Sequence, residues 1–269
     1  ESVYEYNKAK ELGLKILHRS DLLQQISRQY KTIAIAGTSG KSTTTAMIFT
    51  ILENCGFEPS VINGSGLKSL QNEGLIGNCK VGKSDWLIIE AEESDGTLVK
   101  YEPHTGVILN IDRDHKEFDV LLDIFGIFAN NSKNLIVNIS NEKSTLFSRQ
   151  NKFDFGTENT FYYSINQKSS FEGICFDLNN VRFDVPVIGV HNIENAVAAI
   201  AVAQSIGIEL KQISDALKKY QGIDRRMQIV GKIGNSVVID DFAHNPAKIK
   251  AAIESCQMLS QRVIAFFQP

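Results

Sequence analysis

The sequence predicts an α/β protein in which helices cover a mostly parallel sheet. One observation is the apolar run Lys31–Ala36, which ends in Gly37 and precedes helical spacing over residues 41–55. This order of strand, glycine turn and helix opens an α/β unit. A second observation is that short apolar runs typical of strands recur at Pro59–Asn63, Trp86–Ala91, Gly106–Asn110 and Asn134–Asn138. A helical pattern over 119–130 lies between the last two runs. Short runs of Val, Ile and Leu are typical of parallel strands buried on both faces.

The second half of the chain has a different pattern. Within residues 155–187 we expect a small antiparallel annex, with strands at Phe161–Tyr163, Ile174–Phe176 and Val181–Val187. Helical spacing returns at 192–206 and 210–219. Beyond Gly222 the pattern predicts a second α/β domain that opens with Met227–Lys232, Ser236–Asp240, a helix over 246–257 and a strand over 262–267. We therefore predict a linker at 1–30, a central domain at 31–222 and an incomplete C-terminal domain at 223–269.

The composition excludes several classes of protein. Of the 269 residues, 43% are hydrophobic and 22% are charged, a globular balance that argues against disorder. A formal net charge of -3 supplies no basic field for nucleic acid or an anionic membrane surface. No apolar run approaches the roughly 20 residues that span a bilayer. The cysteines are scattered without a Cys-x-x-Cys pair, which predicts free thiols and a reducing, cytoplasmic location: Cys55, Cys79, Cys175 and Cys256.

A glycine-rich loop, Gly37-Thr38-Ser39-Gly40-Lys41-Ser42, links the first strand to its helix. Glycines let backbone N–H groups turn toward an anion, and the helix N-terminus adds partial positive charge. Lys41 is placed to reach the outer phosphates of a nucleotide, and the Ser42 hydroxyl is a ligand for Mg²⁺. The general pattern has a further glycine where this chain has Ile35. The loop predicts phosphate binding, and the alternative is a glycine turn that caps a helix beside a solvated lysine.

Two polar segments follow apolar strands directly. Glu90–Asp95 follows the third strand, and Asn110–His115 follows the fourth. Ligands of open parallel sheets bind beyond the carboxyl ends of the strands, so Glu90 is a candidate Mg²⁺ ligand. His115 is a candidate for binding a metal or a phosphate-bound water. The alternatives are a solvated acidic loop and a surface histidine.

Together with three later motifs, these segments resemble the Mur ligase family, ATP-dependent amide-forming enzymes of bacterial cell-wall synthesis. Residues 37–45 resemble the family's phosphate loop, including its missing first glycine. Glu90–Asp95 is similar to the acidic signature of the branch that accepts UDP-N-acetylmuramate, and Asn110–His115 resembles the metal-proximal segment. The later motifs resemble the adenine-facing motif, the arginine pair at the entry to the C-terminal domain and that domain's nucleotide-facing signature: Gly189–Ala196, Arg225-Arg226 and Asp240–Pro246.

The resemblance implies a reaction and a set of residues. A substrate carboxylate attacks the γ-phosphorus of ATP to give an acyl phosphate, and an amine then displaces phosphate. The implied catalytic residues are Lys41, His115, Arg226 and His244. The implied ATP-binding residues are Gly37, Thr38, Ser39, Gly40, Lys41, Ser42, Thr43, His191, Asn192, Asn195, Arg225, Arg226 and Asp241. The implied Mg²⁺ ligands are Ser42, Glu90 and His115, and Asn63 and Gly64 border the sugar substrate.

The resemblance also implies an architecture. A central P-loop ATPase-like domain with a small antiparallel annex is followed by the start of a Rossmann-like C-terminal domain. Residues 1–30 lead out of an N-terminal domain that binds the uridine nucleotide. We expect this piece to bind ATP weakly and not to complete the ligation alone.

The substrates implied are small molecules, UDP-N-acetylmuramate and an amine, with no nucleic acid and no membrane. The amine is L-alanine in one branch and a whole tripeptide in the closely similar recycling branch. No lysine occurs from Phe118 to Ser132, as in both of these branches, whereas Phe242-Ala243 is slightly more like the recycling enzyme and Asn245 departs from a histidine common in both. Other readings are a folate polyglutamate or cyanophycin synthetase and a non-catalytic ATP-binding module. Taken singly, the later motifs have structural alternatives as helix caps, a linker pair and a strand end.

Overall fold

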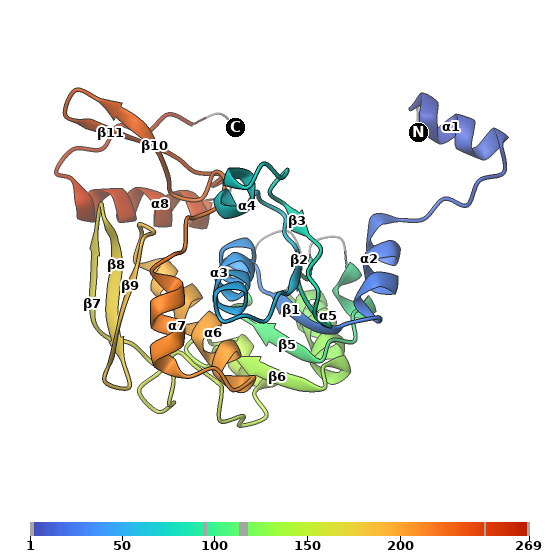
Figure 1. Ribbon diagram of the computed structural model, residues 1–269, viewed down its shortest axis with the longest axis horizontal. Helices are drawn as coiled ribbons and strands as arrows, with labels where there is room; N and C mark the ends of the chain where they lie inside the picture. The colour runs from blue at the N-terminus through green and yellow to red at the C-terminus, as the bar shows by residue number, and fades with distance from the viewer. Residues whose placement is uncertain (1–2, 94–95, 113–117, 245, 268–269) are drawn as a thin grey trace.

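The computed structural model describes residues 3–93, 96–112, 118–244 and 246–267, and a six-stranded sheet forms its centre (Figure 1). The strands of this sheet are β1 (Lys31–Ala36), β2 (Ser60–Ile62), β3 (Cys79–Lys80), β4 (Trp86–Glu90), β5 (Thr105–Ile108) and β6 (Asn134–Val137). They lie in the order β3-β2-β4-β1-β5-β6, and every neighbouring pair is parallel except the antiparallel pair β2–β3. The predicted mostly parallel sheet is confirmed. β1 lies between β4 and β5, so the loop that leaves its carboxyl end is flanked by two further strand ends.

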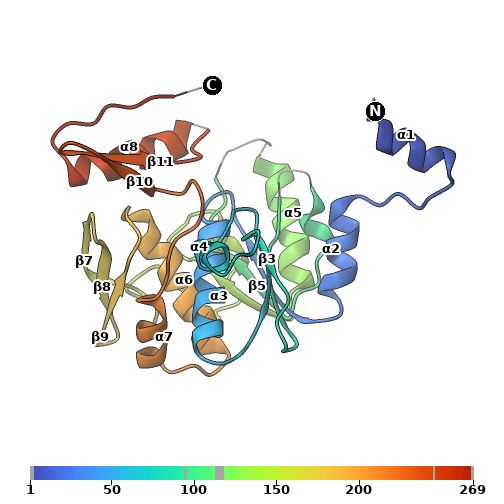
Figure 2. The ribbon, with the colours of Figure 1, turned by 45° about the horizontal axis from the view of Figure 1, so that its top comes forward.

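The described chain contains helices on both faces of this sheet and others that lie away from it (Figure 2). They are α1 (Tyr4–Glu11), α2 (Arg19–Ser27), α3 (Lys41–Asn54), α4 (Lys68–Asn72), α5 (Phe118–Asn131), α6 (His191–Ser205), α7 (Leu210–Leu217) and α8 (Pro246–Leu259), with 3₁₀ turns η1 (Thr97–Lys100) and η2 (Ser144–Phe147). α3, α6 and α7 pack on one face, and α5 and α2 lie on the other (Figure 2). α1 stands apart from the body of the molecule at the end of an extended segment.

The alternation of side chains along β1 explains the two cores. Ile33 and Ile35 face the core that contains α3 and α6, whereas Ala34 and Ala36 face the core that contains α5. Successive strand residues point to opposite faces of a sheet, so one strand contributes to both. The small alanines leave room for the large buried rings of Phe125 and the neighbouring α5 aromatics. The central strand is thus buried on both faces, as its uninterrupted apolar run predicts.

An antiparallel sheet of three strands forms the predicted annex. Its strands are β7 (Ile165–Ser170), β8 (Gly173–Leu178) and β9 (Val181–Val185). Phe176 and Phe183 stack at 5.3 Å between ring centroids on the buried face. The predicted strand at Phe161–Tyr163 is wrong, because Tyr162 forms only an isolated bridge and the first strand is β7. β7 is a largely exposed edge strand, so it lacks the apolar alternation that would have marked it.

The C-terminal part forms a hairpin followed by a helix. β10 (Gln228–Ile233) and β11 (Ser236–Asp240) pair antiparallel, and α8 follows them. This part lies above the layer formed by α3 and α6 (Figure 2). The predicted strand at 262–267 is wrong: residues 261–267 have no regular structure, and Phe266 is 96% exposed. No strand of the described chain pairs with this run, and an apolar segment becomes a strand only where a partner takes up its backbone groups. Among the described residues, no helix combines the length and the apolar character needed to cross a membrane.

Candidate active site

The glycine loop leaves the carboxyl end of β1 and opens α3, as predicted. Gly37 and Gly40 have φ angles of +150° and +87°, a region that favours glycine. A side chain at Gly40 would collide with the amide oxygen of Asn195, and one at Gly37 would press on Leu109 and Asn110. The loop is therefore enclosed by the end of β5 on one side and by α6 on the other. The first N–H groups of an α-helix have no partner within the helix, so those at the start of α3 are available to an anion at this end.

Lys41 rests on the acidic segment that follows β4. Its Nζ donates to the carbonyl of Gly37 at 2.6 Å and to Oε2 of Glu93 at 2.8 Å, with Oε1 of Glu92 at 3.7 Å. The Lys41 and Glu93 side chains are only 11% and 6% exposed. Burial raises the pKa of Glu93, and the charge of Lys41 only partly offsets that effect. The lysine expected to reach phosphates is thus paired with a buried carboxylate in this structure.

Glu90 lies at the carboxyl end of its strand, where its position in the sequence predicts it. It ends β4, and its Oε1 is buried without a hydrogen-bond partner in the described part of the chain. The Oδ1 of Asn63 is likewise buried and unpartnered, and a side chain at Gly64 would approach Oε2 of Glu90 to 2.8 Å. Within the described ranges, no group of three or more His, Cys, Asp or Glu side chains forms a metal cluster. A carboxylate oxygen without a hydrogen-bond partner, in a residue that lines the same cleft as Ser42, suits Mg²⁺ that takes its other ligands from phosphates and water.

Most of the predicted residues line one cleft with a volume of about 520 Å³. The predicted residues that line it are Thr38, Ser39, Gly40, Lys41, Ser42, Thr43, Glu90, His191, Asn192, Asn195, Arg226, Asp241 and His244. The cleft does not include Gly37, Asn63, Gly64 or Arg225; Gly64, however, lies directly against Glu90. His115 lies outside the described residues. The cleft therefore unites the phosphate loop, the end of β4, the start of α6 and the C-terminal part.

The cleft also contains residues that sequence reasoning did not select as site residues. They are Glu92, Glu93, Asn110, Asp112, Glu194, Phe242, Lys248, Ala251 and Ala252. Phe242 organises the C-terminal side, because the guanidinium carbons of Arg225 and Arg226 lie 4.7 and 5.6 Å from its ring centroid. The ring of His244 meets that of Phe242 edge-on at 5.3 Å. The signal for Phe242 was its place inside the motif that also holds Asp241 and His244.

Polar side chains at the start of α6 are tied to one another and to α3. Asn192 donates to the carbonyl of Ile188 at 2.8 Å, and Asn195 donates to Oδ1 of Asn192 at 2.9 Å. Thr44 in α3 donates to Oδ1 of Asn195 at 3.3 Å. Both amides are buried. Because these bonds fix both amides, the start of α6 is rigidly attached to the phosphate-loop helix.

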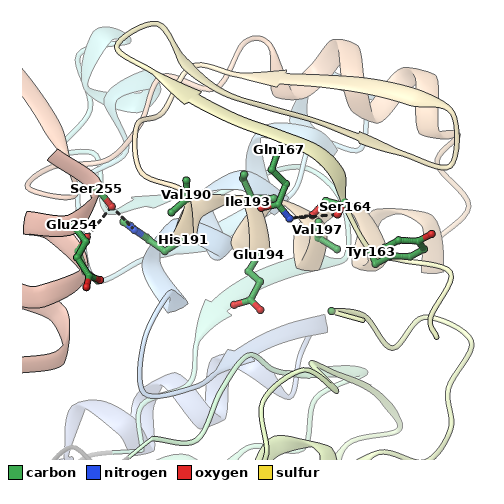
Figure 3. Close-up of a pocket in the computed structure, with 12 residues that line it drawn as sticks. Tyr163, Ser164, Gln167, Val190, His191, Ile193, Glu194, Val197, Glu254 and Ser255 are labelled. Carbon is green, nitrogen blue, oxygen red and sulfur yellow. Dashed lines mark hydrogen bonds between the residues drawn. The ribbon is translucent and has the colours of Figure 1, made fainter. Parts of the chain in front are cut away.

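His191 connects the cleft to a second cavity of about 390 Å³ (Figure 3). Its Nδ1 lies 3.4 Å from Oγ of Ser255 in α8, and Gln167 of β7 lines the far side. Surrounding protein atoms reduce the hydration of the imidazolium and lower the pKa of His191, against an opposing effect of the Asp241 charge. The ring is thus held between α6 and α8, where the central and C-terminal parts meet.

Asp241 stabilises the turn at residues 225–227, where the chain enters the C-terminal part. Its two carboxylate oxygens accept from the backbone N–H groups of Met227 at 2.8 Å and Ala243 at 2.9 Å. Arg225 and Met227 both have φ in the left-handed region, +55° and +47°. Such angles are uncommon for residues other than glycine, and the bonds of Asp241 stabilise this turn. The turn carries the Arg226 side chain into the cleft.

The glycine loop follows the central strand, contains Lys41 and lies beside the acidic end of β4. These features define an α/β protein of the phosphate-loop class. The family model of the Mur ligase middle domain matches residues 35–203, and that of the Mur ligase glutamate ligase domain matches residues 225–269. The chain belongs to the Mur ligase family.

Named relatives agree with this assignment. The chain is 35% identical to the UDP-N-acetylmuramate–L-alanine ligase of Dictyoglomus turgidum, covering 98% of this chain and 60% of that protein. It is 34% identical to the enzyme of the same name from a Nostoc species, covering 98% and 57%. The crystal structure of the UDP-N-acetylmuramate–alanine ligase from Thermotoga maritima superposes with a TM-score of 0.84 at 24% identity, covering 96% of this chain and 61% of that one. The chain thus spans about 60% of the length of the relatives it matches.

Proposed function

We propose that this chain is the ATP-binding part of a UDP-N-acetylmuramate–L-alanine ligase of peptidoglycan precursor synthesis. Relatives at 34–35% identity bear that name over nearly the whole of this chain. The observation that carries the proposal is that Lys41 of the phosphate loop and Arg226 of the C-terminal part line the same cleft. A reaction between a carboxylate and a triphosphate needs positive charge from several directions, because the two reactants repel each other.

ATP supplies the phosphoryl group that converts the substrate carboxylate into an acyl phosphate, from which an amine displaces phosphate. The chain's own residues align and neutralise the reactants. Lys41 neutralises the outer phosphates once it leaves Glu93, and Arg226 approaches them from the opposite wall. His244, which lies against Phe242, borders the same space. Holding the reactants in line supplies much of the rate in reactions of this type.

We further propose a Mg²⁺ site formed by Ser42 and Glu90. The buried, unpartnered Oε1 of Glu90 supports it, as does the opening of Ser42 onto the same cleft. The proposed role of His115 as a further metal ligand rests on the family resemblance alone. His191, Asn192, Asn195 and Asp241 are proposed to surround the adenosine, and Asn63 and Gly64 to border the sugar substrate next to Glu90.

The proposed domains are a linker at 1–30, a central ATP-binding domain at 31–222 and the first part of a C-terminal domain from 223. The proposed substrates are UDP-N-acetylmuramate and L-alanine, and the proposed location is the cytoplasm. The recycling ligase that adds a tripeptide is a second candidate, favoured by Phe242-Ala243. A murein peptide ligase structure from Psychrobacter arcticus shares the fold with a TM-score of 0.74 at 21% identity.

The thermal stability of this chain tests the nucleotide site. ATP with Mg²⁺ is expected to raise the melting temperature, because a ligand that binds only the native state stabilises it. Lys41→Ala should remove most of that shift. Since Lys41→Ala also leaves Glu93 buried without its partner, the double variant Lys41→Ala/Glu93→Gln is the control: it should fold well and still not respond to ATP. A melting temperature that stays constant at millimolar ATP would refute the site.

The amine is tested in the full-length enzyme. Phosphate release with UDP-N-acetylmuramate and ATP is measured with L-alanine and separately with the tripeptide. Stimulation by L-alanine supports the proposed ligase, and stimulation by the tripeptide alone supports the recycling enzyme. Stimulation by neither amine would exclude both ligases. A rise in melting temperature with ATP but without phosphate release would then favour a non-catalytic ATP-binding module.

A further inference from the structure

We propose that Asn110 is a positioning residue that fixes the phosphate loop in the form that receives a nucleotide. This inference rests on the proposed nucleotide binding. Asn110 follows β5 and lies beside the end of β1, where the loop begins. Sequence reasoning placed it only within the segment that leads to His115. Within the described residues, its side chain bonds Thr38 and Ser39, both in the loop.

The side-chain amide of Asn110 makes three hydrogen bonds to two consecutive loop residues. Its Oδ1 accepts from Oγ1 of Thr38 at 2.9 Å and from the backbone N–H of Ser39 at 2.9 Å. Its Nδ2 donates to the carbonyl of Ser39 at 3.1 Å. The backbone carbonyl of Asn110 also accepts from the N–H of Thr38 at 3.2 Å. One side chain therefore binds both the donor and the acceptor of Ser39, as a neighbouring strand would.

A further set of bonds holds Asn110's segment against the loop. The N–H of Asp112 donates to Oγ1 of Thr38 at 3.1 Å. Oδ1 of Asp112 accepts from Nδ2 of Asn141 at 3.1 Å, and Oδ1 of Asn141 accepts from the N–H of Ile111 at 3.2 Å. Gly37 passes so close to Leu109 and Asn110 that a side chain there would be crowded. The Thr38 hydroxyl thus donates to Asn110 and accepts from Asp112, which fixes its direction.

The chemistry of these contacts requires an amide. An aspartate would accept from Thr38 and Ser39, but it would face the Ser39 carbonyl without a proton to donate and would add a negative charge beside bound phosphate. An alanine would leave both backbone groups of Ser39 without partners. Because Asn110 occupies the Ser39 N–H, the groups left for an anion are those at the start of α3. Asn110 therefore selects which N–H groups of the loop face the phosphates.

The test compares Asn110→Ala and Asn110→Asp with Asn138→Ala. Asn138 is a matched control, because it follows the neighbouring strand β6 and its Oδ1 accepts from Ser140 at 3.0 Å, away from the loop. Calorimetry with ATP and Mg²⁺ gives the affinity, and amide NMR or hydrogen exchange reports on Ser39. We expect Asn110→Ala to weaken ATP binding about tenfold, the scale of one to two lost hydrogen bonds. Asn110→Asp should weaken it further, and Asn138→Ala should leave it unchanged.

The local readout separates positioning from general stability. Exchange of the Ser39 N–H should accelerate in Asn110→Ala, which offers it no acceptor, but not in Asn110→Asp, which keeps one. Exchange of Thr44 in α3 should be unchanged in both variants. If Asn110→Ala does not fold, Thr38→Val removes the hydroxyl bonds alone and should weaken ATP binding about threefold. Wild-type ATP affinity in Asn110→Ala, or in Thr38→Val where that variant is used, would overturn the inference and leave the nucleotide site intact. Absence of ATP binding in the unaltered chain would instead refute the proposed function.

Discussion

The ammonium group of Lys41 lies 2.8 Å from Oε2 of Glu93, and both side chains are almost fully buried. In the proposed nucleotide complex, a phosphate displaces Glu93 from Lys41. The raised pKa of Glu93 shows that burial disfavours the carboxylate more than Lys41 stabilises it. The pair therefore holds the lysine in place at a cost in stability, and that cost disappears if the carboxylate is made neutral.

We predict that Glu93→Gln binds ATP with Mg²⁺ more tightly than the wild type, by roughly fivefold or about 1 kcal/mol. The variant removes both a competitor for Lys41 and a negative charge from the cleft. It should be at least as stable as the wild type at neutral pH. Because the pKa of Glu93 is raised in the folded state, the wild type loses folding stability as the pH rises through that pKa. Glutamine does not ionise, so the variant has no such loss.

Calorimetric titration with ATP and urea denaturation at two pH values check this prediction. Glu92→Gln is the matched control, because its carboxylate lies at 3.7 Å from Lys41 and is more exposed. It should change the affinity less. Weaker ATP binding in Glu93→Gln would show that Glu93 itself contributes to the nucleotide site.

Asp224 ties the start of the C-terminal part to the segment that follows β2. It pairs with Lys68 and accepts from Nε2 of Gln71 at 2.6 Å, while its N–H donates to the carbonyl of Gly66 at 2.9 Å. Partial burial opposes ionisation, but the bonds from Lys68 and Gln71 outweigh it and lower the pKa of Asp224. Asp224→Ala should destabilise the protein by about 1–2 kcal/mol at neutral pH.

The pH dependence of this effect has a definite sign. Because the folded pKa of Asp224 is depressed, its stabilisation is present above the ordinary value of 3.8 and is lost as pH falls below it. The difference between wild type and Asp224→Ala should therefore shrink in acid. Urea denaturation at about pH 7 and about pH 3 measures it. A difference that grows toward acid would contradict the assignment.

The sequence identifies elements whose pattern is complete within a short window. β1, α3 and α6 carry uninterrupted apolar or helical spacing, and the structure confirms them within one residue or two. Whether a segment such as β7 or the run at 262–267 forms a strand depends on which segment lies next to it in the fold. No local sequence pattern indicates that neighbour. The exposed edge of a sheet tolerates polar residues, while an apolar run without a neighbour remains a coil.

The same distinction holds for the site. The glycine loop and Glu90 follow from strand ends and turn chemistry, which are local. The pairing of Lys41 with Glu93 joins residues 52 positions apart, and the bond from Thr38 to Asn110 joins residues 72 positions apart. The fold brings these partners together, and no local pattern in a single sequence indicates which distant residues will pair.

Tyr220 offers a test of a buried polar group outside the site. Its side chain is 2% exposed, its hydroxyl has no hydrogen-bond partner in the described part of the chain, and burial raises the pKa of the phenol. Tyr220→Phe should leave stability unchanged or raise it by up to about 1 kcal/mol. Tyr162 is the control, because its hydroxyl donates to Gln204 at 2.8 Å. Tyr162→Phe should destabilise by about 1 kcal/mol, and equal effects of the two variants in urea denaturation would contradict the difference.

A comparison of Gly40, in the phosphate loop, with Gly56, outside it, distinguishes the cost of backbone strain from the cost of steric crowding. Both have φ near +80° to +90°, but Gly56 faces open space while Gly40 faces the amide oxygen of Asn195. Gly56→Ala should cost about 1 kcal/mol, the penalty for a left-handed alanine. Gly40→Ala should cost more and should also abolish the ATP-dependent rise in melting temperature, because relief of the collision with Asn195 moves the loop that holds Lys41. Urea denaturation and thermal melting with and without ATP measure both effects. Equal stability losses, or a preserved response to ATP in Gly40→Ala, would show that the contact with Asn195 does not set the shape of the loop.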